Sequence, residues 1–69
     1  MTPEEKEYQK LKGEIKTELK LIFKANMKIF NWDIPEANDH RAAELILKAM
    51  KDAITEIDEE VKSGKYDTF

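Results

Sequence analysis

The stretch Asn31–Asn38, which reads NWDIPEAN, decides the fold because it separates two long runs of helical periodicity. Proline lacks a backbone N–H and restricts the residue before it, and Asn and Asp are common in turns. The stretch, residues 31–38, therefore predicts a loop between two helices. We expect Trp32 and Ile34 to fold back over the end of the resulting hairpin.

Two starts of the second helix are compatible with this stretch. The segment Asp33–Glu36, which reads DIPE, has the features of a cap and first turn, and would leave a connection of about three residues. A helix that began there would turn the carboxylates of Glu36 and Asp39 toward the apolar face that holds Ala43. A cap at Asn38 or Asp39 avoids this, so the sequence favours the later start.

Upstream of the loop, the sequence predicts one helix over about residues 3–30. Thr2 suits the N-cap, Pro3 suits the first helical position, and Glu5 follows three residues after the cap. Gly13 is the weak point, because glycine inside a helix costs about 0.5–1 kcal/mol relative to alanine. The apolar residues that recur at the spacing of one helical face are Tyr8, Leu11, Ile15, Leu19, Ile22, Phe23, Ile29 and Phe30.

Downstream of the loop, the sequence predicts a second helix over about residues 39–63 and a short tail over 64–69. The apolar positions that follow the helical period are Ala43, Ile46, Leu47, Met50, Ala53, Ile54, Ile57 and Val61. Gly64 suits the left-handed backbone position just past a helix end. Since no segment alternates apolar and polar residues as a strand does, the predicted fold is all-α: an antiparallel two-helix hairpin in a single domain.

The apolar arcs of both helices widen toward the loop. At about 100° per residue, Leu45 lies about 140° around its helix from Met50, and one facing helix does not cover both. Two hairpins around a shared core would cover them, so we expect a homodimer that forms a four-helix bundle. The residues expected at the self-association surface are Leu21, Phe23, Ala25, Ala42, Leu45 and Ala49. The alternative is a three-helix monomer in which the first helix breaks at Gly13.

The composition narrows the classes of protein that remain. The 69 residues contain no cysteine, which excludes disulfides, thiolate metal sites and cysteine nucleophiles. The longest apolar run, Leu21–Phe23, is far shorter than the ~20 residues of a membrane span. The acidic N-terminal residues are unlike a targeting peptide. We therefore expect a cytoplasmic protein that does not enter a membrane.

Charge is divided unevenly between the two halves of the chain. Residues 1–30 carry a net charge of +2 and residues 31–69 a net charge of -5, which together give -3. Antiparallel packing is therefore expected to bring opposite charges together and to fix the pairing of the helices. The acidic residues expected to lie beside Lys6, Lys10 and Lys12 are Asp52, Glu56, Asp58, Glu59 and Glu60.

Lysines recur every four residues along the first helix. Most of this stripe lies opposite the apolar face, where lysine stems commonly cover the margins of a core. The functional alternative is an anion-binding face for nucleic acid or phosphate, formed by Lys16, Lys20, Lys24 and Lys28. Arg41 is the only arginine, and the isoelectric point is near 5.1, which disfavours nucleic acid as a partner.

The sequence offers no arrangement typical of catalysis or of metal binding. His40 is the only histidine, with Glu36 and Glu44 four residues to either side, and we expect it to lie at the surface. Gly13 and Gly64 stand alone and form no phosphate-binding loop. We therefore expect no catalytic residues, no metal ligands and no cofactor.

The functional expectation is a small helical interaction or regulatory module that self-associates and also binds a second protein. Tryptophan and tyrosine are enriched among the residues that contribute most to binding at interfaces. The residues expected to contact an outside partner are Trp32, Ile34, Tyr66 and Phe69, unless they cap the ends of the bundle itself. The alternative function is a nucleic-acid-associated factor that uses the lysine face.

Overall fold

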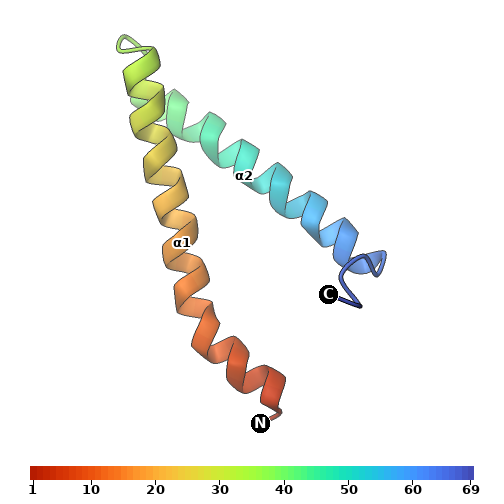
Figure 1. The fold of residues 1–69 in the computed structure, drawn as a ribbon. Coiled ribbons are helices and arrows are strands. Elements are labelled where there is room, and N and C mark those ends of the chain that lie inside the picture. The colour runs from red at the N-terminus through yellow and green to blue at the C-terminus, as the bar shows by residue number, and fades with distance from the viewer.

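The computed structural model describes all residues, 1–69, and contains two helices and no strand. Helix α1 spans Pro3–Asp33 and helix α2 spans Asp39–Lys62. Figure 1 shows the two helices joined at one end by the loop, with both chain termini at the other. The prediction of an all-α hairpin is confirmed. Helix α1 continues through Gly13, so the three-helix alternative is not the fold that the chain adopts.

Both helices begin with a side-chain cap that the sequence signals. The Thr2 hydroxyl accepts a hydrogen bond from the backbone N–H of Glu5 at 3.1 Å, and Pro3 occupies the first helical position. The Asn38 carboxamide oxygen accepts one from the N–H of Arg41 at 2.9 Å. These caps satisfy N–H groups that have no partner within the helix. Helix α2 begins at Asp39, the later of the two starts considered from the sequence.

Helix α1 ends three residues later than the sequence suggests. The N–H of Ile34 still bonds to the carbonyl of Phe30 at 2.9 Å, and the helix stops only because Pro35 disfavours a helical backbone in the residue before it. Pro35 then takes the second position of a turn that the N–H of Ala37 closes onto the carbonyl of Ile34 at 3.0 Å. The connection is therefore short and proline-stiffened.

Helix α2 ends in a Schellman motif. The N–H of Gly64 bonds to the carbonyl of Val61 at 3.1 Å, and the N–H of Lys65 bonds to that of Glu60 at 3.0 Å. Gly64 has a φ of 84°, which the motif requires and which glycine adopts without strain. The helix proper ends at Lys62, one residue before the expected end.

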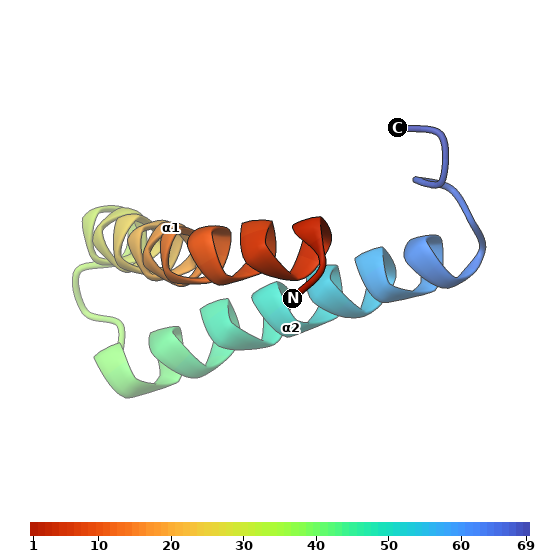
Figure 2. The same ribbon diagram turned by 90° about the horizontal axis from the view of Figure 1, so that it is seen from below.

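The two helices lie side by side only near the loop and diverge toward the termini, as the two perpendicular views show (Figures 1 and 2). The radius of gyration is 16.0 Å, whereas a compact domain of this length would have about 11 Å. Only two residues are buried: Ala42, 2% exposed, and Ile46, 9% exposed. The hairpin therefore has a core at its closed end and two open arms.

The arms diverge because the face of α1 that meets α2 is apolar over only part of its length. Phe30 and Phe23 are half-buried and line hollows between the helices. Two further steps of seven residues toward the N-terminus reach Lys16 and Gln9, which are exposed. Seven residues make nearly two full turns, so these four positions lie along almost one line. The face of α1 toward α2 is thus apolar near the loop and polar farther out, where the helices diverge.

Two expectations about packing are wrong. No ion pair joins the helices, because the acidic end of α2 diverges from the lysines of α1; the side-chain pairs are Lys48–Asp52, Lys62–Asp58, His40–Glu44 and Lys65–Glu60, all within α2 or between α2 and the tail. Trp32 does not fold back over the hairpin. It is 86% exposed, since α1 continues past it and fixes its direction. Ile34 does lie against the closed end, beside Ile29 and Ile46.

Candidate interaction surface

Two shallow hollows flank the contact between the helices at the closed end. The first is lined by Asn26, Ile29, Phe30, Asp33, Ile34 and Ile46. The second is lined by Leu19, Lys20, Phe23, Lys24, Leu47 and Met50. On α1, Asn26 and Lys24 lie about 160° apart around the axis, so the hollows open on opposite flanks of the hairpin. Each hollow is lined mainly by hydrophobic residues, with Asn26 and Asp33 at the first and Lys20 and Lys24 at the second.

The structure separates the six residues expected at the self-association surface into two groups. Ala42 is buried by α1 of its own chain, and Phe23 is half-buried in the same intramolecular contact. The prediction is wrong for Ala42, because the first turn of α2 packs close to α1 at this small side chain. The residues that remain exposed are Leu21, Ala25, Leu45 and Ala49. Leu45 lies about 160° around α2 from Leu47, and thus on the flank that carries Ile29.

A longer line of apolar residues runs along α1 beside the face that contacts α2. The spacing of apolar residues at one helical face did not distinguish this line from the contact face. Tyr8, Ile15, Ile22 and Ile29 follow one another at intervals of seven residues, and we call these four residues the α1 seam. Each is between 51% and 56% exposed. The seam lies about 100° around the helix from the line of Phe23 and Phe30, because each seam residue directly precedes a residue of that line. The sequence signal for this line is the strict seven-residue interval, which is lost when all apolar residues of α1 are assigned to one broad face.

Helix α2 has an uncovered line of its own. Leu47, Ile54 and Val61 are also spaced by seven residues and are about half-exposed. Leu47 borders the second hollow, beside Leu19 and Phe23 of α1. Ile54 and Val61 follow one and two steps of seven residues later, toward the end of α2 that diverges from α1 (Figure 1). Both arms of the hairpin therefore present apolar side chains to solvent, and neither covers the other.

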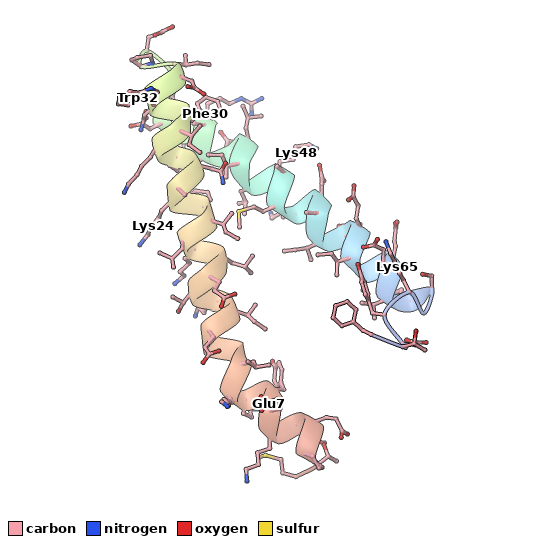
Figure 3. All side chains as sticks on the ribbon, in the orientation of Figure 1. Glu7, Lys24, Phe30, Trp32, Lys48 and Lys65 are labelled. Atoms are coloured by element: carbon pink, nitrogen blue, oxygen red, sulfur yellow. The ribbon has the colours of Figure 1, made fainter.

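The four residues expected to contact an outside partner do not form one surface. Trp32 lies at the closed end (Figure 3), where Ile34 caps the end of α1, whereas Tyr66 and Phe69 belong to the tail that follows α2. The molecule is 50 Å along its longest dimension, which keeps the two pairs apart. The rings of Tyr66 and Phe69 pack edge to face, with centroids 6.0 Å apart.

The tail is held to the end of α2 through Glu60. The Tyr66 hydroxyl donates a hydrogen bond to Glu60 Oε1 at 2.9 Å, and the Lys65 ammonium bonds to Oε2. These two bonds, the one from Lys65 first, lower the pKa of Glu60. The same carboxylate raises the pKa of Tyr66 and of Lys65 by favouring their protonated forms. In most Schellman motifs an apolar contact joins these positions, and here a polar cluster replaces it.

The lysines considered as an anion-binding face are all exposed. None of Lys16, Lys20, Lys24 and Lys28 takes part in an ion pair. Lys20 and Lys24 border the second hollow, beside Leu19, Phe23 and Met50, so their stems lie along the apolar contact. Two of the four lysines thus combine an apolar packing role with a free ammonium group.

The titratable groups form no site for a metal ion. His40 is 3.5 Å from Glu44 and is exposed. Glu56, Glu59, Glu60 and Ser63 line an open hollow on α2, but no group of three His, Cys, Asp or Glu side chains is arranged to hold an ion. Neither helix combines the length and apolar character that crossing a membrane requires.

Comparison of this chain with protein families, with curated proteins and with solved structures finds no match. The chain's own surface is therefore the basis for its proposed function. The feature that stands out on this surface is the apolar area on both arms.

Proposed function

We propose that this protein is a small helical interaction module that acts as a homodimer, with no catalytic activity of its own. The observation that carries the proposal is the surface area of the hairpin. The chain exposes 6284 Å², whereas a folded monomer of 8.1 kDa exposes about 4,500 Å². The hairpin alone thus leaves an excess of about 1,800 Å² in contact with water.

This excess matches what a permanent dimer buries. Standard protein–protein interfaces bury about 800 Å² per partner, and obligate homodimers bury about 2,000–5,000 Å² in total. Two hairpins that each lost their excess would bury about 3,600 Å², within the obligate range. Since the uncovered side chains include isoleucine, leucine and valine on both arms, the lost area would be largely apolar.

A homodimer of two hairpins would be a four-helix bundle, and its outer surface would remain free for a second protein. Tyr66 and Phe69, in the tail beyond the open end of α2, are the candidate contact for such a partner, since tyrosine is enriched where binding energy concentrates.

The test is the molar mass in solution. We expect size-exclusion chromatography with light scattering to give twice 8.1 kDa at micromolar chain concentration. Helix content should fall on dilution, because the open arms lose their cover when the chains separate. A mass of one chain, with helix content independent of concentration, would overturn the proposal.

A second candidate function, association with nucleic acid, is favoured by one observation: the four lysines of the anion-binding face have no acidic partners. In a dimer this charge would be doubled. Replacing Lys16, Lys20 and Lys24 together by Gln would abolish binding to a duplex at low salt while leaving the dimer intact. If the wild-type chain does not bind the duplex even at low salt, this candidate fails.

A further inference from the structure

We propose that the dimer forms through the α1 seam, with α1 of one chain lying parallel and in register with α1 of a second copy. This inference rests on the self-association proposed above and assigns it a surface and an orientation. The surface differs from the one that the sequence predicts, which centres on the wide apolar arcs near the loop.

The seam has, at one of the two core positions of a heptad repeat, the residue type of a two-stranded coiled coil. With Tyr8, Ile15, Ile22 and Ile29 at position a, three of the four a residues are isoleucine, which favours parallel dimers when leucine stands at d, as Leu11 does. The d positions of the same repeat are Leu11, Glu18, Ala25 and Trp32. All eight residues are exposed in the hairpin.

Helix α2 leaves this face accessible. It packs on the line of Phe23 and Phe30, about 100° around α1 from the seam. Among the seam residues, only Ile29 borders the contact with α2, and it is still 56% exposed. A second helix can therefore pack along the seam without displacing α2.

The charges beside the seam favour a second copy as the occupant. In a parallel pair, position g of one helix meets position e of the other, five residues later. Glu7 would then face Lys12 of the second copy, and Lys28 would face Asp33 of the second copy. By symmetry each pair occurs twice, and no pair at these positions brings like charges together. The surface is thus complementary to itself.

Glu18, at position d, is the one charged residue among the a and d positions of this repeat. In the parallel pair it would face Glu18 of the second copy, near the middle of the interface. A polar residue at a single core position commonly sets register at a cost in stability. Removing this charge should therefore strengthen the dimer if the seam is the interface.

The experiment uses the absence of cysteine in the chain. Ala25→Cys places one thiol at a d position, where the two copies face each other in a parallel, in-register pair. Lys24→Cys places a thiol at the same depth on another face and is the matched control. We expect Ala25→Cys to form a covalent dimer in a glutathione redox buffer at least tenfold faster than Lys24→Cys.

Light scattering on the reduced chains separates the two levels of the proposal. A dimer in which Ala25→Cys cross-links no faster than Lys24→Cys would overturn the seam and leave self-association standing. A monomer would overturn both.

A second measurement does not depend on cross-linking. Glu18→Leu should lower the dimer dissociation constant at least tenfold, and Lys6→Leu, on the opposite face of α1, should leave it within threefold. An unchanged or raised dissociation constant for Glu18→Leu would overturn the seam.

Discussion

The closed end of the hairpin and its open arms consist of the same two helices, yet they differ in what covers their apolar side chains. At the closed end, α1 buries Ile46 and Ala42 of α2. Along the arms, Ile15 and Ile54 are half-exposed, although they continue the same helices. The difference shows that long amphipathic helices form a hairpin core only as far as their apolar lines face each other. Beyond that point, apolar residues are available for another chain.

The largest effect is expected from a charge placed on the open arm. Ile15→Asp should raise the dimer dissociation constant at least about 100-fold, because the interface would bury an unpaired carboxylate on each chain. Sedimentation equilibrium over a range of chain concentrations measures this change. Thr17→Asp adds the same charge to another face of α1 and should change the constant by less than tenfold. Equal effects of the two substitutions would show that the open arm of α1 is not an interface.

A cavity created at the closed end should lower the stability of the hairpin itself. Ile46→Ala should lower the free energy of unfolding by about 2–4 kcal/mol, since it removes buried methylene groups and leaves a void. Ile54→Ala makes the same change on the half-exposed arm of α2 and should cost less than half as much. Urea denaturation at chain concentrations low enough for the hairpin to be monomeric compares the two variants. If Ile54→Ala costs as much as Ile46→Ala, the arms are covered as fully as the closed end.

The two glycines should respond in opposite directions to alanine. At Gly13, on the arm of α1, an added Cβ meets no atom within 4 Å, so Gly13→Ala should raise stability by about 0.5–1 kcal/mol. At Gly64 the φ of 84° strains any other residue, and the Cβ would lie 2.9 Å from Asp67 Oδ2. Gly64→Ala should therefore lower stability. Thermal unfolding of both variants gives the signs, and a stabilising Gly64→Ala would contradict the Schellman geometry.

The smallest effect is expected in the tail, as a function of pH. The lowered pKa of Glu60 means that its bonds stabilise the tail above the ordinary value of 4.5 and are lost as pH falls through the lowered value. The raised pKa of Tyr66 means that its contribution is present below 10.0 and is lost as pH rises through the raised value. The tail should therefore stay docked between these limits.

Absorbance titration of the phenol tests this directly. In a Tyr8→Phe background Tyr66 is the only tyrosine, and its pKa should lie above 10.0. Adding Glu60→Gln should return the value toward 10.0, because the carboxylate that favours the protonated phenol is gone. An unchanged titration curve would show that Tyr66 does not bond to Glu60 in solution.

Local signals in the sequence were enough to predict how both helices begin and how α2 ends. Thr2, Asn38 and Gly64 act on backbone groups within a few residues of themselves, so their roles follow from residue type and position. The cluster of Lys65 and Tyr66 around Glu60 was not predicted. It depends on the path of the chain after the helix ends, and no periodic pattern encodes that path.

The divergence of the arms was not predicted because a list of apolar positions hides their angles. Ile22 and Phe23 both belong to one apolar face by spacing, yet they are about 100° apart and serve different neighbours. Treating them as one face implied that the two helices pack side by side over their full length, which led to the expected ion pairs between them. Such packing would require Lys16 and Gln9 to be apolar.

Trp32 gives the molecule a built-in optical reporter. It is the only tryptophan, it is 86% exposed in the hairpin, and it occupies the last d position of the heptad repeat that contains the α1 seam. Association through the seam would transfer its indole from water to an apolar environment and shift its fluorescence emission to shorter wavelength. Dilution would reverse the shift. Assembly of this protein can thus be followed in the unmodified chain, without a dye or a tag.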